Sequence, residues 1–365
     1  MHKVELLIKP ASYLCNLDCT YCFYKKTAAI YRNPSMMNSG VLEKFISAVM
    51  GYSAGGHCVF SWQGGEPLLA GVDFYKKVVE LQSRYGRSGQ IVSNTIQTNG
   101  LLIDEKFTEF FKKYRVFIGL SLDGPREIHN VYRKHPSGEG TFNEVMAKAR
   151  LLEREGVEFN ILSTVGEETA KHPEKIYRFL VSSGFRYLQF IPAVDRRSGR
   201  MKKSFSVTPE TYGEFLCRLF DTWWNNGRPD ASVRLFDNIM EVLLGVEPGA
   251  CSFKKRCGEY LVVEHNGDVY PCDFFVNPEF MVGNLLDTSF EELVRRVKED
   301  FGRLKEEPVE ECANCRWNFI CNNGCCWFRW VSCGNVHDKD YLCPAFKKFF
   351  PHAMDRLKIL ASSIR

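Results

Sequence analysis

Cysteines are the residues of this chain whose type and spacing point most directly to chemistry. Three of the 15 cysteines lie close together, at Cys15, Cys19 and Cys22, in a C-x3-C-x2-C pattern. Three thiolates on one loop can hold three irons of a four-iron cluster and leave the fourth iron open to an external ligand. A structural zinc site would need a fourth protein ligand. The spacing therefore favours an iron–sulfur site that binds an external molecule, with zinc or scattered core thiols as the alternative.

A second group of ten cysteines lies between Cys251 and Cys343. Eight thiolates suffice for two fully ligated four-iron clusters, although C-x2-C spacing also suits zinc at one of the two sites. The eight with the spacing C-x5-C-x14-C, then C-x2-C-x5-C-x3-C and a distant cysteine, are Cys251, Cys257, Cys272, Cys312, Cys315, Cys321, Cys325 and Cys343. Cys326 and Cys333 are left over, and either could replace Cys325 as a ligand. Cys58 and Cys217 are expected to pack in the core.

The first cluster loop must be positioned by the elements around it. Short β-rich runs alternate with amphipathic stretches of helical length, which predicts six parallel strands in an open or barrel-like sheet. The runs cover residues 4–12, 57–65, 91–100, 116–124, 158–166 and 187–194. Several of them end in polar or Gly-rich segments, at residues 63–66, 97–100 and 121–124. Ligands of parallel α/β sheets bind at the carboxyl ends of the strands, so these segments should converge on one site.

The rest of the chain is organised differently. Thr208 and Pro209 have the form of a helix start, and a stripe of large apolar residues follows at helical spacing, as expected for core packing. Further on, residues 259–275 read as a hairpin with its turn at Asn266-Gly267-Asp268. We therefore divide the chain into residues 1–205, a helical linker region over 206–250, and a cysteine-rich domain over 251–365.

Composition and charge exclude several classes of protein. The 365 residues are 45% hydrophobic and carry a net charge of +4 with both signs interleaved, which favours a globular protein without a strong polyanion-binding signal. The basic segment 195–203 is more simply a solvated loop. No apolar run approaches the ~20 residues that span a bilayer, and the N-terminus has no secretory signal. We expect a cytoplasmic protein that binds neither membrane nor nucleic acid, and a monomer.

The cysteine loop and the strand ends together resemble the radical S-adenosylmethionine (SAM) superfamily. Its signature is C-x3-C-x2-C followed by an aromatic residue, here Phe23. By that resemblance SAM binds the open iron, and the barrel is a partial (β/α)6 barrel over residues 5–194. The segment Gln63, Gly64, Gly65 and Glu66 is similar to the motif that contacts the SAM amino group, while Ser121, Asp123 and Arg133 resemble the positions that hold its ribose and carboxylate.

The C-terminal cysteines resemble the SPASM domain of radical SAM enzymes that modify peptides and proteins. The resemblance implies that Cys251, Cys257, Cys272 and Cys325 bind a first auxiliary cluster. It assigns Cys312, Cys315, Cys321 and Cys343 to a second. The implied cofactors are three [4Fe-4S] clusters and SAM.

Within that superfamily the chain resembles the anaerobic sulfatase-maturating enzymes along almost its whole length, from LLIKPAS to GDVYPCDFF and the closing cysteines. The resemblance implies that a 5′-deoxyadenosyl radical takes a Cβ hydrogen from a Cys or Ser of a sulfatase polypeptide, in a Cys/Ser-x-Pro/Ala-x-Arg segment, to give Cα-formylglycine. Asp273 is implied as the proton acceptor, and Tyr24 is a candidate substrate-side residue. A donor such as flavodoxin or ferredoxin is expected to supply electrons.

Three other functions compete with this interpretation. The main alternative is a SPASM enzyme that cross-links a ribosomal peptide through thioether or carbon–carbon bonds. Such enzymes often carry an N-terminal peptide-recognition domain, whereas this sequence has only 14 residues before Cys15. A plain electron carrier would not need the GGEP motif at residues 64–67, the SLDG motif at residues 121–124 or Arg133. A radical SAM enzyme that modifies nucleic acid is supported only by the basic segment 195–203.

Overall fold

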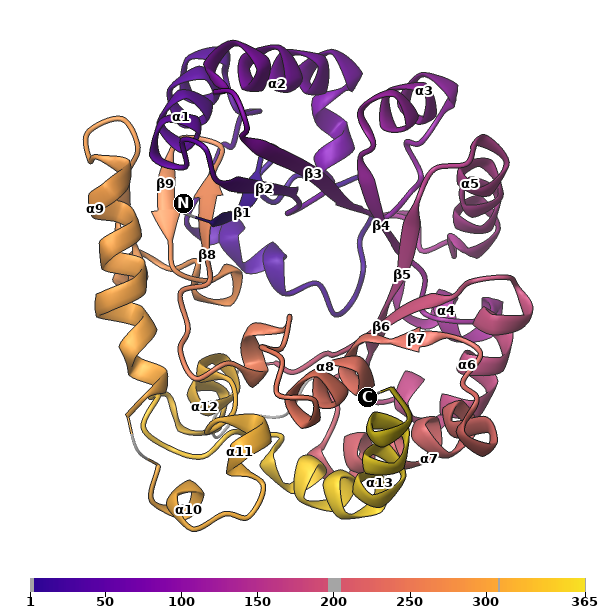
Figure 1. The fold of residues 1–365 in the computed structure, drawn as a ribbon. Helices are drawn as coiled ribbons and strands as arrows, with labels where there is room; N and C mark the ends of the chain where they lie inside the picture. The colour runs from indigo at the N-terminus through magenta and orange to yellow at the C-terminus, as the bar shows by residue number, and fades with distance from the viewer. Residues whose placement is uncertain (1–2, 196–204, 308, 365) are drawn as a thin grey trace.

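The protein is built on one long sheet that curves into an incomplete barrel (Figure 1). A computed structural model describes residues 3–195, 205–307 and 309–364. Within these residues the sheet has ten strands in the order β10-β9-β8-β1-β2-β3-β4-β5-β6-β7. Their bounds are β1 Val4–Lys9, β2 His57–Trp62, β3 Ile91–Thr98, β4 Phe117–Ser121, β5 Phe159–Val165, β6 Tyr187–Pro192, β7 Ser232–Val233, β8 Tyr260–Glu264, β9 Asp268–Tyr270 and β10 Gly283–Asn284.

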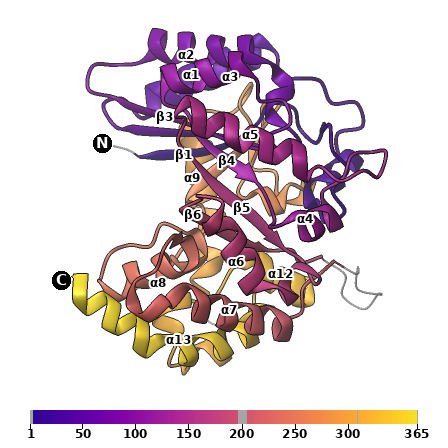
Figure 2. The same cartoon turned by 90° about the vertical axis from the view of Figure 1, so that its right-hand side faces the viewer.

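The six strands expected from the sequence are confirmed, and β1 to β6 pair in parallel in chain order. Leu6 of β1 stands opposite Phe60 of β2, and both side chains are fully buried. Parallel strands of this kind need helical crossovers, which cover the outside of the sheet. Figures 1 and 2 show α1, α2, α3 and α5 on that outer side, so that the opposite face of the sheet lines the interior of the barrel.

Helix starts are set by capping side chains. Asn38, Asp104 and Thr208 each accept a hydrogen bond from a backbone N–H of the first turn, at the starts of α1, α3 and α7. The helices have the bounds α1 Ser39–Tyr52, α2 Val72–Tyr85, α3 Glu105–Tyr114, α4 Arg126–Tyr132, α5 Phe142–Glu155, α6 Pro173–Ser182, α7 Pro209–Trp224, α8 Arg234–Leu243, α9 Phe290–Arg295, α10 Glu310–Ala313, α11 Asn318–Cys321, α12 Cys326–Cys333 and α13 Cys343–Ile364.

The sheet continues past the boundary that we placed near residue 205. Strand β7 pairs with β6, and β8 pairs in parallel with β1, so segments from beyond residue 205 close both edges of the six-stranded sheet. The hairpin predicted around Asn266-Gly267-Asp268 is confirmed as β8 and β9. It brings Cys272 and Asp273, which follow β9, to the same sheet as the first cysteine loop.

The apolar stripe of α7 packs as the sequence predicted. All six of its large residues are buried: Tyr212, Phe215, Leu216, Leu219, Phe220 and Trp223. Gly213 lets the backbone of α13 approach closely, because a Cβ there would lie 3.1 Å from the Cα of Ala345. The basic segment 195–203 lies, except for its first residue, outside the described residues. In the part of the chain that is described, no helix is both long enough and apolar enough to cross a bilayer.

Candidate active site

The loop after β1 gathers Cys15, Cys19 and Cys22 at the carboxyl end of the sheet. Cys15 is exposed, Cys19 is buried and Cys22 is half-buried. Desolvation by the surrounding loop raises the pKa of Cys15, and the Cys19 and Cys22 thiolates raise it further. The backbone N–H of Leu17 donates to Cys15 Sγ at 3.4 Å, and the Asn99 side-chain amide donates to the same sulfur at 3.7 Å. The end of β3 thus holds one thiol of the loop in place.

The Gly-rich turn after β2 packs closely against that loop. Gly65 has a φ of +51°, and a Cβ on it would stand 2.1 Å from the backbone oxygen of Leu14. The backbone N–H of Glu66 donates to the same oxygen at 2.8 Å, and that of Gln63 donates to Ile8 O at 2.8 Å. A Cβ on Gly64 would lie 2.3 Å from the Lys9 side chain. Only glycine allows this close approach.

The Glu66 carboxylate accepts hydrogen bonds from several groups of the protein itself. It is fully buried and accepts hydrogen bonds from the N–H of Leu68 and Asn99 and from the hydroxyl of Thr98, at 2.8–3.0 Å. Burial raises its pKa to about 7, although these hydrogen bonds oppose the shift. Its observed contacts join the ends of β2 and β3, and they leave the backbone of the turn as the part that can face SAM.

Asp123 and Arg133 form a buried ion pair at the end of β4. The Asp123 carboxylate lies 3.1 Å from Arg133 Nε and also accepts hydrogen bonds from Tyr21 Oη at 2.6 Å and from Thr164 N at 2.9 Å. Asp123 is fully buried, so in this structure it orients Arg133 and does not itself present a free acceptor. Ser121 lies on the same strand end and accepts from the Gln97 amide at 3.2 Å.

Four cysteines from the C-terminal segment share a second environment. Burial raises the pKa of Cys251 to about 11, with a further contribution from the Cys257 thiolate. Burial also raises the pKa of Cys272, and the thiolates of Cys325 and Cys251 add to it. The pKa of Cys325 is also raised, first by burial and then by the thiolates of Cys251 and Cys257. The structure therefore brings together the four cysteines assigned to the first auxiliary cluster.

Cys326 and Cys333, the two leftover cysteines, differ in position. The Cys326 thiol lies 3.5 Å from Cys257 Sγ and is buried in an apolar cluster with Phe275 and Trp327. Cys333 is exposed, with its thiol near the backbone oxygens of Arg329 and Asn335. The choice of Cys325 over these two stays a prediction, and Cys326 is the nearer competitor.

The other four cysteines line a cavity. Cys312, Cys315, Cys321 and Cys343 all lie on its wall, together with Asp340 and Trp317. Burial raises the pKa of Cys321 to about 12, and the other three thiolates add to the shift. Among the described residues, no three His, Cys, Asp or Glu side chains converge on a single-ion position. A cavity walled by four thiols has the donor set that a four-iron cluster needs.

Asp273 lies between the barrel and the first auxiliary site. Its carboxylate is 3.9 Å from Lys9 Nζ and accepts hydrogen bonds from Tyr260 Oη at 3.4 Å and from Cys272 Sγ at 3.7 Å. The side chain is largely but not completely buried. A carboxylate held in this way beside a ligand cysteine can accept a proton from a group that approaches it.

Tyr24, the candidate substrate-side residue, is buried instead of facing outward. Its hydroxyl donates to the Glu264 carboxylate, and its ring lies 4.5 Å from Lys9 Nζ. Lys9 is 1% exposed and stands beside Glu264 in the register of β1 and β8. Sequence reasoning missed Lys9 and Glu264. A charged residue directly after a run of apolar residues, LLIK or LVVE, was the signal that could have found them.

Two family models match the chain. The model of the radical SAM superfamily matches residues 10–180, and that of an iron–sulfur cluster-binding domain, SPASM, matches residues 251–316. The first covers the cysteine loop, the Gly-rich turn and the Asp123–Arg133 pair. The second covers Cys251, Cys257 and Cys272 and the start of the second cysteine set.

Curated relatives match over nearly the full length. A cysteine-type anaerobic sulfatase-maturating enzyme of Clostridium perfringens is 39% identical over 100% of both chains. A serine-type anaerobic sulfatase-maturating enzyme of Bacteroides thetaiotaomicron is 36% identical over 97% of this chain and 91% of its own length.

Solved structures give the same result for the fold. The structure of native anSMEcpe with bound AdoMet and the Cp18Cys peptide superposes with a TM-score of 0.93 at 38% identity, over 100% of both chains. SuiB of Streptococcus suis, bound to the precursor peptide SuiA, gives a TM-score of 0.64 at 15% identity over 93% of this chain and 75% of SuiB. At that identity the likeness shows the fold alone.

Proposed function

Because the chain belongs to the anaerobic sulfatase-maturating enzymes of the radical SAM superfamily, we propose that it oxidises a Cys or Ser side chain of a sulfatase polypeptide to Cα-formylglycine. The substrate is a Cys/Ser-x-Pro/Ala-x-Arg segment. The observation that carries the proposal is Asp273, a partly accessible carboxylate held between the barrel interior and the first auxiliary site.

The cofactor ligands follow from the thiols that the fold gathers. We assign Cys15, Cys19 and Cys22 to the cluster that binds SAM, and Gln63, Gly64 and Gly65 to the turn whose backbone faces the SAM amino group. Ser121 and Arg133 contact the remaining polar groups of SAM, while Glu66 and Asp123 act indirectly by fixing the strand ends and Arg133. The two auxiliary clusters take the four-cysteine sets described above.

The reaction removes two hydrogens from the substrate side chain. When bound, SAM with the first cluster supplies a radical that takes the Cβ hydrogen, and the auxiliary clusters supply an acceptor for one electron. Asp273 takes the proton of the thiol or hydroxyl, which leaves a C=S or C=O bond at Cβ. A thioaldehyde then reacts with water to give the aldehyde and hydrogen sulfide. Lys9 keeps the Asp273 carboxylate oriented toward the substrate.

The partners and location of the enzyme extend the proposal. A redox protein such as flavodoxin or ferredoxin supplies the electron that starts the reaction. The enzyme acts as a monomer in the cytoplasm, where cysteines stay reduced and able to bind the clusters.

The test is mass spectrometry of substrate peptides after anaerobic incubation with reductant and SAM. A Cys-x-Pro-x-Arg peptide and a Ser-x-Ala-x-Arg peptide are incubated separately with the reconstituted enzyme. Formylglycine at the Cys or Ser position is expected in at least one of them, and the ratio of the two yields gives the substrate preference. A cross-linked peptide without an aldehyde would replace the proposal with the peptide-maturase alternative, and SAM cleavage without any peptide product would leave no support for it.

A further inference from the structure

Two cations are buried in the C-terminal domain without a carboxylate partner. Lys305 and Arg329 are both 0% exposed. Among the described residues, no carboxylate oxygen lies within 4.0 Å of either side chain's nitrogens. Buried charges in proteins are normally paired or bound to a metal site, because removing an isolated ion from water is very unfavourable. These two cations therefore need a compensating negative charge from somewhere else.

Their hydrogen bonds go to backbone carbonyls of the cysteine loops. Lys305 Nζ donates to the oxygens of Cys251 and Ser252 at 3.1 and 2.8 Å. Arg329 donates to the oxygens of Asn323, Val336 and Lys305 at 2.9–3.1 Å. Carbonyl dipoles solvate a cation, but they carry no net charge to neutralise it.

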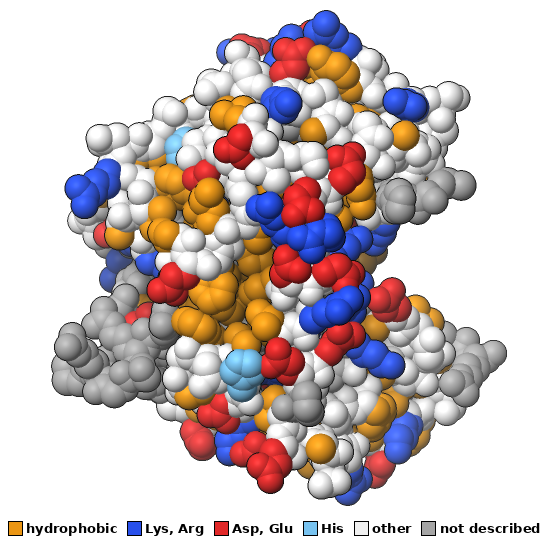
Figure 3. Space-filling model, turned by 90° about the vertical axis from the view of Figure 1, so that its left-hand side faces the viewer, with side chains coloured by type: hydrophobic (Ala, Val, Ile, Leu, Met, Phe, Trp, Pro, Cys, Tyr) orange, Lys and Arg blue, Asp and Glu red, His pale blue; other side chains and the backbone are white. Residues whose placement is uncertain are grey.

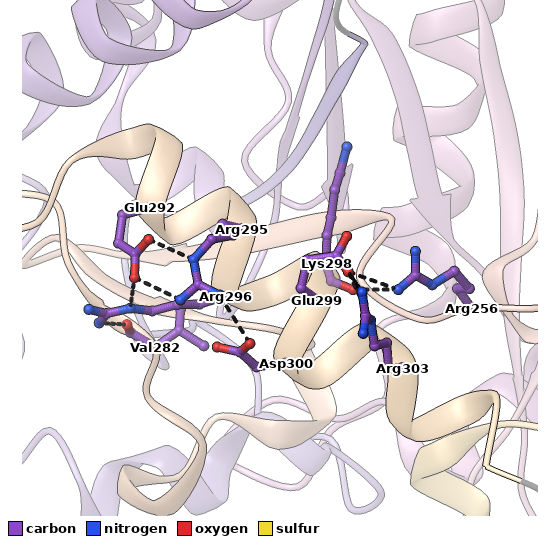
Figure 4. A network of polar contacts seen from close by, with 9 residues as sticks. All are labelled: Arg256, Val282, Glu292, Arg295, Arg296, Lys298, Glu299, Asp300 and Arg303. Carbon is purple, nitrogen blue, oxygen red and sulfur yellow. Dashed lines mark hydrogen bonds and ion pairs between the residues drawn. The ribbon is translucent and has the colours of Figure 1, made fainter.

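The surface of the same domain shows the usual arrangement. Arg295 of α9 pairs with Glu292 at 2.8 Å, and Arg303, just after the π-helical stretch Arg296–Phe301, pairs with Glu299 at 2.6 Å (Figure 4). Figure 3, which views the left-hand side of Figure 1, shows basic and acidic side chains interspersed there. These two arginines have carboxylate partners, whereas the two buried cations do not.

The groups that lie around Lys305 and Arg329 are the auxiliary cysteines. Lys305 Nζ donates to the backbone oxygen of Cys251 itself, and Arg329 Nε donates to the oxygen of Asn323, which lines the cavity of the second cysteine set. Asp340 also lies between the two cysteine sets. It accepts hydrogen bonds from Cys325 N and Leu342 N at 2.8 and 2.7 Å, and it offsets at most one of the two positive charges.

We infer that Lys305 and Arg329 compensate the negative charge of the two auxiliary clusters and keep their reduction potentials high enough to accept the electron that substrate oxidation releases. Four thiolates outweigh the positive inorganic core of a four-iron cluster, so each site is anionic, and one-electron reduction makes it more so. A nearby cation stabilises the reduced state more than the oxidised state and raises the potential. Lys305 acts on the cluster of Cys251 and Cys257, and Arg329 on the cluster of Cys312. The inference rests on the proposed auxiliary ligand sets.

The experiment compares charge-removing with charge-keeping variants of the full chain. Lys305→Gln and Arg329→Gln keep N–H donors but remove the charge, whereas Lys305→Arg and Arg329→Lys keep the charge. All are made in a Cys15/Cys19/Cys22→Ala background, so that only the auxiliary clusters are observed. Redox titrations followed by electron paramagnetic resonance give the midpoint potentials, and iron analysis gives cluster content. Lys348→Gln, an exposed lysine paired with Glu214, is the control for loss of a surface charge.

Each Gln variant should shift one midpoint potential to a more negative value, a different one for Lys305 and for Arg329, while the Arg, Lys and control variants match the parent. Unchanged potentials in Gln variants with full iron would overturn the inference. If a Gln variant loses auxiliary iron and its charge-keeping partner does not, charge compensation is supported. If both lose iron, the side chain acts through its shape alone and the inference is wrong. A parent protein with fewer than two auxiliary clusters would instead contradict the proposed ligand sets.

Discussion

At the scale of single residues, the reaction separates into two parts that depend on different side chains. In the proposed reaction Cys15, Cys19 and Cys22 hold the cluster that generates the radical, whereas Asp273, the proposed proton acceptor, contacts Lys9, Tyr260 and Cys272. One part can therefore be changed without the other.

Asp273→Asn is the variant that tests this separation. Asn has nearly the same shape, but its amide cannot take up the substrate proton. We expect SAM cleavage to survive, while the yield of formylglycine falls by ~10²–10⁴, the range for loss of a general base. The measurement is 5′-deoxyadenosine, oxidised peptide and iron on one anaerobic sample.

The matched control is Asp287→Asn, which changes an exposed aspartate on the loop after β10. It should leave all three quantities at the parent level. Normal peptide oxidation with Asn at position 273 would exclude the proton-acceptor role. Loss of iron in that variant would show that Asp273 supports the auxiliary site structurally.

The sequence pointed to Asp273 through its place next to Cys272, but not to its surroundings. Lys9 and Glu264 are neighbours only because β8, more than 240 residues after the start of β1, pairs in parallel with it. Such pairing between distant segments leaves no local pattern. The same holds for Asp123, whose family motif suggests a contact to SAM, while the fold surrounds it with Tyr21, Arg133 and Thr164.

At the scale of elements, the turn after β2 connects the sheet to the first cysteine loop. Its geometry depends on Gly65, because a Cβ would overlap the Leu14 oxygen at 2.1 Å and the residue has a positive φ. The Leu14 oxygen directly precedes Cys15, so a displaced turn would move the first ligand of the cluster.

Gly65→Ala should therefore lower SAM binding and the iron content of the first cluster. Gly55→Ala serves as the control, since Gly55 also has a positive φ, of +75°, but nothing lies within 4 Å of the position of its Cβ. The control should show only the strain of an Ala at positive φ, about 1 kcal/mol of stability. Equal iron content and equal SAM binding in the two variants would mean that contact with the loop is unimportant.

Glu66 makes the junction of β2 and β3 sensitive to pH. Its pKa is raised from 4.5 to about 7, mainly by burial. The folded protein therefore holds this proton more tightly than the unfolded chain does. The stability contributed by Glu66 is fully present below pH 4.5 and is lost as the pH rises to 7, by about 3 kcal/mol.

Glu66→Gln should remove that pH-dependent component. We expect the difference in unfolding free energy between pH 5 and pH 7.5 to be smaller in the Gln variant than in the parent, when both are unfolded anaerobically by denaturant. The absolute stability should also change, because the Gln side chain donates as well as accepts hydrogen bonds. That change does not affect how the unfolding free energy depends on pH. The control is Glu80→Gln, which changes an exposed carboxylate and should leave the pH dependence of the unfolding free energy as in the parent. The same pH dependence in Glu66→Gln as in the parent would contradict the raised pKa.

The elements themselves were largely predictable from local patterns. The six parallel strands, the cap at Thr208 and the hairpin at Asn266-Gly267-Asp268 all have signals within a few residues. The addition of β7 and β8 to the two edges of the sheet has none, because β7 is only two residues long and β8 pairs with a strand at the other end of the chain. The sequence therefore suggested separate segments where the structure has one sheet.

At the scale of the whole molecule, the continuous sheet places three thiol sites in a fixed order. The first loop follows β1, the first auxiliary set lies next to the hairpin that pairs with β1, and the cavity of the second set lies farther along the chain at the start of α13. Asp340 connects the two auxiliary sets, because it accepts a hydrogen bond from Cys325 N and also lines the cavity of the second set. In the proposed assignment the three clusters therefore share one protein framework but have separate ligands.

Separate ligands on a shared framework predict that the first cluster can be removed alone. The reconstituted protein should hold about twelve irons, from three four-iron clusters, and Cys15, Cys19 and Cys22 replaced together by Ala should leave about eight. The segment after Cys22 contacts the auxiliary region through Phe23, which packs on Phe274, and through Lys26, which donates to Phe274 O, and the substitutions leave these side chains intact. SAM cleavage should be abolished, while the unfolding transition changes little. Iron and sulfide analysis with a SAM cleavage assay measures both. Retained SAM cleavage would contradict the assignment of the first cluster, and iron well below eight would show that the three sites assemble as one unit.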